Sequence, residues 1–384
     1  MKLTLFFTYG MTLKRWDSSG LFSREVKPYI RLVESGIDVT FVTYGDASEH
    51  EFESRMSGIK VIPIYEYIRK PRTKLIRFLH SFYIAPQLIE NYGESNPSHD
   101  IEEIDILKTN QMWGSWLAVA VKKLIEKPLI VRCGYEKYSS DCQRKAPWWM
   151  RVLTYRVSRS AYKNADAVVL SSDRDVEFVS RKFKISKDKI SVISNMIDTE
   201  LFYPALKSES EIKRILYIGR LTEVKNLHIV IEALSGTGIG FDIYGRGELK
   251  KELIELSEKY NVDLKIYKNI PNDKLPDIYR KYPIFVLMSQ FEGNSKVLLE
   301  AMSSGNAVIA SNIPGNSAII ENGVNGIVVE PDPCELRRSI EELMENCELR
   351  RKLASNARDT ITSKFSLKQG IARELELLKK LKLT

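Results

Sequence analysis

The 384-residue chain has few of the residues that bind metals or form disulfides. It contains only four histidines, and none of its four cysteines stands in a CxxC pair, so a zinc site is not expected. We expect Cys133, Cys142, Cys334 and Cys347 to be reduced thiols of a cytosolic protein.

Long apolar runs are also absent. The longest, such as 116–121, fall far short of the ~20 residues that a membrane-spanning helix needs. The first apolar stretch, 3–7, is short and lacks a small-residue cleavage site, so it predicts a buried strand rather than a signal peptide. With 43% apolar and 28% charged residues, the composition is that of a globular protein, and the length suggests two or three domains.

Acidic residues are missing from two segments of the first half of the chain. Residues 67–89 contain five Lys and Arg, and residues 143–165 contain six, with no Asp or Glu in either. The whole chain has a net charge of +8. This local concentration of positive charge predicts an anionic partner, such as a nucleic acid, a lipid surface or a phosphorylated substrate.

The second basic segment predicts an amphipathic helix over 148–163. One side of this helix is apolar and carries Trp149, Met150, Leu153, Val157 and Ala161. The other side mixes cations with aromatic side chains, namely Arg151, Arg156, Arg159, Lys163, Trp148, Tyr155 and Tyr162. Interfacial helices have this mixture, and the segment 67–89 is similar, with Phe78 and Phe82 among its cations. Two interpretations stay open: a solvated face over a core, or contact with an anionic membrane surface. No nucleic-acid module is recognised, so we expect no nucleic-acid partner.

Alternating strands and helices predict an α/β protein with two parallel sheets. In the first half, strands are expected at 3–7, 39–43, 59–62, 104–108, 129–132, 167–171 and 190–193. In the second half, they are expected at 214–218, 240–244, 264–267, 284–287, 307–310 and 326–329. Helices are expected up to about Glu34 and over 367–383.

A polar stretch with Pro and Ser at 203–210 predicts a linker. We therefore expect an N-terminal domain over 1–203, joined by the C-terminal helix 367–384, and a second domain over 204–366. The glycines of 236–240 precede a strand, whereas a dinucleotide fingerprint must follow one, so this run predicts a turn.

The most informative residues follow the strand 284–287. Gly293, Asn294 and Ser295 favour a turn, and Ser295 is a plausible N-cap for a helix that ends near Gly305. The N-terminus of such a helix attracts a phosphate or a sugar hydroxyl. Glu292 lies in the loop and Glu300 in the helix, at the sheet edge where open α/β sheets bind ligands. Taken alone, this pattern is equally compatible with a helix that carries a surface Glu at each end.

A second group of polar residues follows the strand 214–218. Gly219 permits close approach of a ligand, and Arg220 and Lys225 lie in the loop after it. Two cations at one strand end can clamp a diphosphate, with the guanidinium bridging two oxygens. The alternative for this loop is a solvated basic turn. Gly245, which follows the strand 240–244, is a weaker signal of the same form.

Together these junctions resemble the retaining glycosyltransferase family 4. A Gly-Arg-Leu element with Lys-Asn is followed about 70 residues later by Glu-Gly-x-x-x-x-Leu-Leu-Glu-Ala-Met, then by Pro314-Gly315 and 322–326. The similarity is most specific over 214–332 and weaker over 192–204. The resemblance implies the GT-B fold, with two Rossmann-like domains that face each other across a cleft and a C-terminal helix that crosses back to the first domain.

The resemblance also implies roles for individual residues. Arg220 and Lys225 would hold the diphosphate of a nucleotide-sugar donor, and Glu300 would bond its ribose. Glu292 would hold the donor sugar, together with the backbone of the residues that follow it, Gly293, Asn294, Ser295, Lys296 and Val297. Gly20 would lie in a first-domain loop that closes over the phosphates.

Three positions depart from the family pattern. Ala318 stands where many members have a Glu, and the loop at Gly20 has one Gly instead of two. The strand that ends near Thr109 lacks the His that many members place beside the donor sugar. Lys108 or Asn110 is the expected replacement, which leaves the identity of the sugar open.

We therefore expect a retaining hexosyltransferase that needs neither a metal nor another cofactor. Its partners would be a nucleotide-diphosphate sugar, a lipid-linked or surface-glycan acceptor, and an anionic membrane surface at the cytosolic face. The alternatives are a GT-B binding protein without transferase activity, or a related phosphorylase or epimerase.

Overall fold

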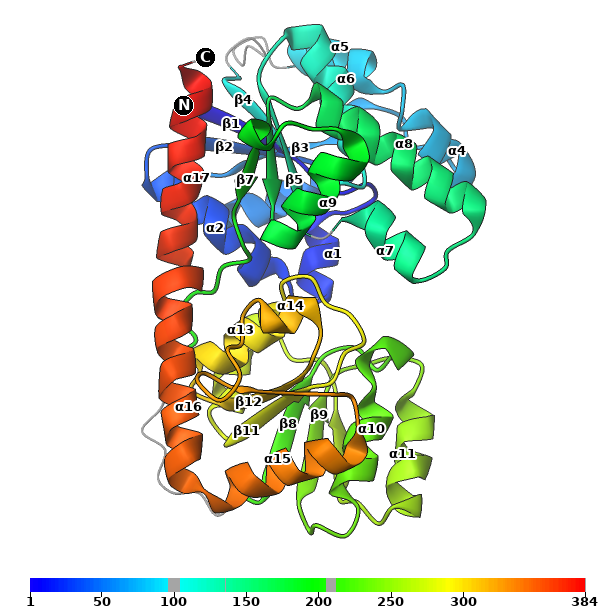
Figure 1. The fold of residues 1–384 in the computed structure, drawn as a ribbon. Helices are drawn as coiled ribbons and strands as arrows, with labels where there is room; N and C mark the ends of the chain where they lie inside the picture. Colours follow the sequence, from blue (N-terminus) through cyan, green and yellow to red (C-terminus); the bar gives the residue numbers. More distant parts are fainter. Residues whose placement is uncertain (96–103, 135, 205–211, 384) are drawn as a thin grey trace. The chain divides into compact units, whose positions relative to one another are not determined.

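The computed structural model of the protein describes residues 1–95, 104–134, 136–204 and 212–383. These residues form two compact units (Figure 1). The N-terminal unit contains Met1–Ser194 and the chain end from Ile371, and the second unit is Asn195–Gly370. The expected linker lies, from residue 205 on, outside the described residues.

The boundary between the units follows Ser194, not residue 203 as expected. Asn195 Nδ2 donates a 2.6 Å hydrogen bond to the backbone oxygen of Asn294, and Phe202 is buried in the core of the second unit. These contacts assign residues 195–203 to the second unit, because burial and hydrogen bonding outweigh the change in composition that the sequence shows.

The described part of the N-terminal unit contains a parallel sheet with the order β3-β2-β1-β4-β5-β6-β7. Its strands are β1 (Lys2–Phe6), β2 (Asp38–Thr43), β3 (Lys60–Pro63), β4 (Ile106–Thr109), β5 (Leu129–Cys133), β6 (Ala167–Leu170) and β7 (Ile190–Val192). The central strand β1 pairs with β2 from Lys2↔Asp38 to Phe6↔Val42 and with β4 from Leu3↔Ile106 to Phe6↔Thr109. These strands are apolar runs because helices cover both faces of the sheet.

The described part of the second unit contains a parallel sheet with the order β10-β9-β8-β11-β12-β13. Its strands are β8 (Arg214–Ile218), β9 (Gly240–Tyr244), β10 (Leu264–Tyr267), β11 (Ile284–Leu287), β12 (Ala307–Ser311) and β13 (Ile327–Val329). All strands predicted from the sequence are therefore confirmed, with ends within two residues of those expected. In each sheet the order reverses beside the first strand, and this reversal is where open α/β sheets bind ligands.

The helices of the N-terminal unit connect successive strands. They are α1 (Leu13–Ser18), α2 (Phe22–Glu34), α3 (Ile64–Tyr67), α4 (Lys74–His80), α5 (Ala85–Ser95), α6 (Ser115–Ile125), α7 (Lys137–Gln143), α8 (Trp148–Asn164) and α9 (Asp173–Phe183). A 3-10 helix spans Ala47–Arg55. The short helix α1 lies in a stretch expected to be a loop, and the side chain of Thr12 caps it by accepting from the backbone N–H of Arg15.

The helices of the second unit are α10 (Leu227–Leu234), α11 (Lys250–Lys259), α12 (Leu275–Tyr279), α13 (Lys296–Ser303), α14 (Pro314–Ser317), α15 (Pro333–Glu345) and α16 (Cys347–Thr360), followed by a π-helical turn at Ile361–Phe365. The predicted turn at 236–240 is confirmed, because Gly236 and Gly238 have positive φ angles and lie between α10 and β9.

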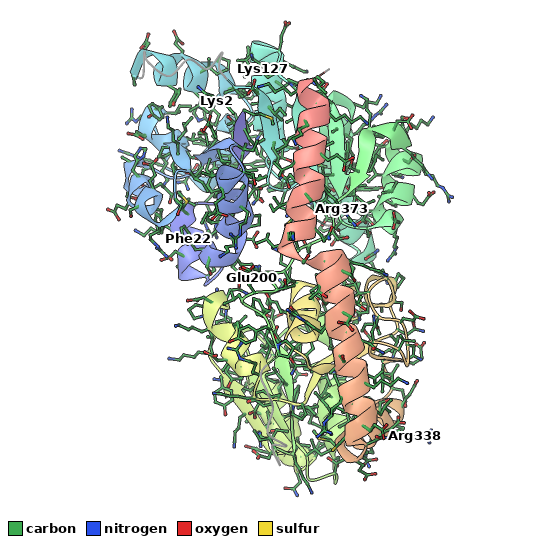
Figure 2. All side chains as sticks on the ribbon, turned by 90° about the vertical axis from the view of Figure 1, so that its left-hand side faces the viewer. Lys2, Phe22, Lys127, Glu200, Arg338 and Arg373 are labelled. Atoms are coloured by element: carbon green, nitrogen blue, oxygen red, sulfur yellow. The ribbon has the colours of Figure 1, made fainter. Side chains whose placement is uncertain are left out.

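The C-terminal helix α17 (Leu367–Lys382) begins in the second unit and packs, from Ile371 on, in the N-terminal unit. Leu378 is fully buried there, and the carboxylate of Glu374 forms a buried ion pair with Lys108 of β4. Figure 2 shows this helix along the N-terminal unit, with Arg373 labelled on it. Among the described residues, no helix is both long and apolar enough to cross a bilayer.

Candidate functional site

The loops that follow β8 and β11 form one site at the carboxyl edge of the second sheet. The two strands are neighbours, with Ile284 paired to Ile215. Beyond them, Gln290 joins the loops twice: its backbone N–H donates to Val224 O at 2.8 Å, and its amide donates to Asn226 Oδ1 at 2.9 Å. The two groups of residues that the sequence suggested separately are therefore held together.

An ion pair between Lys225 and Glu292 lies at the centre of this site. Both side chains are mostly buried, with 13% and 15% of their surface exposed. The hydroxyl of Ser289 donates to the same carboxylate oxygen, Glu292 Oε1, at 2.8 Å. The cation expected at the diphosphate and the carboxylate expected at the sugar are thus within bonding distance of each other.

Arg220 differs from Lys225 in that it is exposed, and no hydrogen bond joins its guanidinium to another described residue. The backbone of Arg220 is held by a hydrogen bond, because the hydroxyl of Tyr217 donates to Arg220 O at 3.0 Å. Burial raises the pKa of Tyr217, and the negative charge of Glu292 raises it further, so this phenol stays protonated and donates. The site therefore contains one paired cation and one free to turn toward a ligand.

The glycines Gly219 and Gly245 are explained by close backbone packing. A Cβ atom on Gly245 would lie 1.8 Å from Gly219 O, and one on Gly219 would lie 2.5 Å from the hydroxyl of Tyr217. The backbone N–H of Gly219 donates to Tyr244 O at 3.0 Å, which joins the ends of β8 and β9. Their first role is thus to let two strand ends meet beside Arg220.

The residues Gly293, Asn294 and Ser295 lead into α13, as expected. Ser295 is the N-cap residue but makes no side-chain capping bond, and the first turn carries no acidic residue. The N–H groups at this helix start are therefore available to an anion or a hydroxyl. The side-chain oxygen of Asn294 is buried and has no hydrogen-bond partner among the described residues. Lys296 and Val297 form the first turn of α13, and both are half-buried.

Glu300 is completely buried on the inner face of α13. Asn272 Nδ2 donates to Glu300 Oε1 at 2.9 Å, and the hydroxyl of Tyr279 donates to Glu300 Oε2 at 3.0 Å. These two donors, one to each oxygen, fix the orientation of the carboxylate.

A third loop completes the site. A Cβ atom on Gly315 would lie 2.3 Å from Glu292 O and 2.6 Å from Gly293 O, so only glycine fits at the start of α14. Ala318, at the C-terminal end of α14, is exposed. Ser289, Asn272 and Tyr279 were not predicted from the sequence. Asn272 and Tyr279 belong to segments more than 20 residues before Glu300, and a serine such as Ser289 has no local signature as a carboxylate partner.

The structure separates the two candidates that were expected beside the sugar. Asn110 follows β4 and is almost entirely buried, whereas Lys108 is buried within β4 and contacts α17. There it pairs with Glu374 and lies 5.1 Å from the ring centre of Tyr29. Its side chain is 3% exposed, so the structure argues against the expected contact between Lys108 and a sugar. Gly20 ends α1 with a φ of 70°, a conformation that favours glycine.

The predicted helix over 148–163 is confirmed as α8, but its faces differ from those expected. Tyr162 is fully buried and Trp149 is 54% exposed, the reverse of the assignment made from helical periodicity. The two ends of α8 differ in exposure: Trp148 and Trp149 at its start are more than half exposed, while Tyr162 near its end packs against Phe183 of α9. The cations expected at a membrane surface are all exposed: Arg151, Arg156, Arg159 and Lys163.

Metal ligands do not cluster in the described ranges, where no group of three His, Cys, Asp or Glu side chains is placed to hold an ion. The four cysteines are free thiols, and burial raises the pKa of the Cys133 thiol. Metal-independent activity stays a prediction.

Comparison with known proteins shows to which family the chain is similar. The family model described as Glycosyltransferase Family 4 matches residues 30–201, and the one described as glycosyl transferases group 1 matches residues 198–360. A glycosyltransferase of Methanocaldococcus jannaschii that has not been characterised is 26% identical over 371 residues, which cover 89% of each chain.

Two further proteins are similar. UDP-Gal:alpha-D-GlcNAc-diphosphoundecaprenol alpha-1,3-galactosyltransferase of Escherichia coli is 27% identical over 252 residues, 60% of this chain and 63% of its own. The crystal structure of Anabaena HepE in complex with UDP superposes with a TM-score of 0.75 at 18% identity, over 99% of this chain and 100% of that one. With two matched family models that together span residues 30–360, the chain belongs to glycosyltransferase family 4 and has the GT-B fold.

Proposed function

We propose that the protein transfers a sugar from a nucleotide-diphosphate sugar to a lipid-linked or surface-glycan acceptor, with retention of the anomeric configuration and without a metal. The observation that carries this proposal is the group Arg220, Lys225 and Glu292 beside the uncapped start of α13. A diphosphate, a sugar and two cations have complementary chemistry at this edge of the sheet.

Two of the similar proteins support the nature of the substrates. HepE was crystallised with UDP, and the relative from Escherichia coli is named for a UDP-galactose donor and a diphosphoundecaprenol-linked acceptor. By analogy, the donor of this chain is a nucleotide-diphosphate sugar and its acceptor a glycan or a lipid-linked glycan precursor.

In the proposed reaction, an acceptor hydroxyl attacks the anomeric carbon on the face from which the nucleotide departs. The bond from the anomeric carbon to the phosphate oxygen breaks, its electron pair goes to that oxygen, and the oxygen takes the hydroxyl proton. Arg220 and Lys225 stabilise the negative charge that develops on the diphosphate, which is the role a metal has in other enzymes. Lys225 exchanges its contact with Glu292 for the phosphate, and the released carboxylate accepts from hydroxyl groups of the sugar.

The proposal is tested with a panel of nucleotide sugars and polyprenyl-diphosphate-linked acceptors. We expect one donor to raise the melting temperature and to release nucleoside diphosphate, and NMR of the product to show the anomeric configuration of the donor. Tight donor binding without turnover on any acceptor would favour the binding-protein alternative. An inverted product, or a sugar phosphate formed from inorganic phosphate, would contradict the proposed reaction.

A further inference from the structure

Exposed apolar side chains gather on two helices of the N-terminal unit. Among the described residues, half of the large exposed apolar side chains lie in the short stretches 75–83 and 148–152. They are Leu75, Ile76, Leu79, Tyr83, Trp148, Trp149 and Val152. Leu75 is 68% exposed and Trp148 is 71% exposed. Burial of such side chains stabilises a protein, so a cluster of exposed ones indicates a surface that contacts a partner.

Helix α4 has one side that packs on the protein and another that exposes apolar residues to solvent. On its inner side, Phe78 packs within an aromatic cluster, with ring centres 5.9 Å from Trp116 and 5.5 Å from Tyr9. The neighbouring positions Leu75 and Leu79, four residues apart, share the outer side of the helix. Phe78 therefore anchors α4, while the two leucines project to solvent.

Helix α8 begins in the same manner. Trp148 and Trp149 occupy its first turn and are both more than half exposed, whereas Val157 and Ala161 further along pack in the core. Indole rings are amphipathic and favour the boundary between water and hydrocarbon. An exposed pair of them at a helix start is suited to that boundary.

Helix α6 links the two groups. Its residue Trp116 contacts Phe78 and Phe82, and the same helix packs against α8. In Figure 1, α4 and the N-terminal end of α8 both lie at the right-hand rim of the N-terminal unit. We call this region the α4–α8 surface, defined by Leu75, Ile76, Leu79, Trp148 and Trp149.

Cations surround the α4–α8 surface, and neither segment that contributes to it contains an acidic residue. The exposed ones are Arg69, Lys70, Arg72 and Lys74 before and in α4, and Arg144, Lys145, Arg151, Arg156 and Arg159 before and in α8. An apolar centre with a cationic border is complementary to a bilayer whose headgroups are anionic. A purely polar, acidic partner would attract the cations but would give the apolar side chains nothing to bind.

We propose that the α4–α8 surface inserts into anionic lipid bilayers, with its apolar side chains among the acyl chains and its cations at the headgroups. This inference rests on the proposed function only in supplying a reason, a lipid-linked acceptor, for the enzyme to be at a membrane. Each cation at an anionic surface adds about fivefold to binding, and the apolar centre adds a part that salt does not screen.

The first test uses the full chain and sedimentation with vesicles of phosphatidylcholine alone or with 30% phosphatidylglycerol. We expect binding only to the anionic vesicles, weaker at high salt. The emission of Trp148 and Trp149 should shift to the blue and be quenched by brominated acyl chains. Because other tryptophans contribute, the variant W148F/W149F should lose most of this quenching while it still binds vesicles.

Two matched pairs of variants separate the contributions. L75S/L79S should weaken vesicle binding at least tenfold, whereas L124S/I254S, which changes two exposed apolar residues elsewhere, should leave it unchanged. R151S/R156S/R159S should weaken binding and reduce its salt dependence, whereas K250S/K265S/K268S, with the same loss of charge in the second unit, should have a smaller effect.

The inference is overturned if the wild type ignores anionic vesicles at low salt, or if L75S/L79S binds as the wild type does. It is also overturned if light scattering shows that this surface joins two copies of the chain in place of contacting lipid. Nucleotide affinity, measured without vesicles, tests the proposed function independently. An intact donor affinity with no membrane binding would refute this inference alone, and the converse would refute only the proposed function.

Discussion

The ammonium of Lys225 donates to the carboxylate of Glu292. These two residues lie 67 positions apart, one in the loop after β8 and the other in the loop after β11. Because two adjacent parallel strands bring both loops to one edge, a cation suited to phosphate and a carboxylate suited to sugar hydroxyls share a single polar centre. A substrate that separates them must offer each a replacement partner, as a sugar diphosphate does.

Replacement of either cation should slow the transfer. K225A and R220A should each reduce turnover by roughly 10²–10³, the usual effect of removing one group that stabilises developing charge. Initial rates of nucleoside diphosphate release measure this, with K250A as the control for an exposed lysine of the same unit. Near-native rates in both variants, with unchanged melting temperature, would refute the assignment.

The two carboxylates of the motif should have separable effects. E300A should weaken binding of the free nucleoside diphosphate and of the donor alike, since both contain a ribose. E292A should impair transfer and leave nucleotide affinity nearly unchanged, because its expected partner is the sugar. Isothermal titration with nucleoside diphosphate distinguishes them, and an equal loss of affinity in both would show that the roles are wrong.

The two residues that donate hydrogen bonds to Glu300, Asn272 and Tyr279, allow its role in nucleotide binding to be tested without removing the carboxylate. Y279F removes one of its donors and should weaken nucleotide binding by about tenfold, the effect of one hydrogen bond to a charged group. Y260F is the matched control, since Tyr260 is a half-buried tyrosine of the same unit.

Chelation should leave the activity unchanged. The cations of the loop after β8 can neutralise the leaving diphosphate, so no divalent ion is required for that step. Transfer rates should be equal within error before and after dialysis against EDTA. Loss of the rate with EDTA, restored by Mg²⁺ or Mn²⁺, would show that a metal takes part.

The buried pair of Lys108 and Glu374 should stabilise the attachment of α17 to the N-terminal unit. E374A leaves the ammonium buried without its counter-charge, which costs about 3–5 kcal/mol. K382A, which removes an exposed partner of Asp105, should cost less than about 1 kcal/mol. Urea denaturation and hydrogen exchange of residues 371–383 measure both effects, and equal stability of the two variants would contradict the buried role.

The stability of the N-terminal unit should fall as the pH rises through the range in which Glu136 ionises. Burial raises the pKa of this carboxyl, although the N–H of Ser139 and the hydroxyl of Ser158 donate to it. The folded protein therefore holds the proton more tightly than the unfolded chain does, and this advantage is lost above the folded pKa.

The variant E136Q tests this sign, because it keeps an acceptor without the titration. Its melting temperature should fall less than that of the wild type between about pH 4.5 and pH 7, while E94Q, a change at an exposed glutamate of α5, should follow the wild type. Parallel curves for E136Q and the wild type would contradict the expected shift.

The strands could be predicted because their signal is local. A parallel strand that is covered on both faces must be apolar throughout. Runs such as 284–287 and 307–310 can therefore be recognised as strands from their own residues alone. Helix α1 was not predicted, because it is shorter than two turns and its start depends on a single side-chain cap at Thr12.

The faces of helices were less predictable than their positions. Helical periodicity places Trp149 on the apolar side of α8 and Tyr162 on the polar side, yet the exposures are reversed. Periodicity says which residues share a side, but the elements that pack on each turn decide which side is buried, and that cover changes along a helix of 17 residues.

By itself, the sequence determined the two α/β units and the residues Arg220, Lys225, Glu292 and Glu300 as one motif set, since glycines, strand ends and helix starts have local signatures. Tertiary structure alone decided that Lys225 pairs with Glu292, that Asn272 and Tyr279 hold Glu300, and that Lys108 pairs with Glu374 of α17. The physical reason is that distance and burial in the folded protein decide which polar groups pair. Residues that follow separate strands meet at a sheet edge, and the sequence around each of them contains no signal of the other.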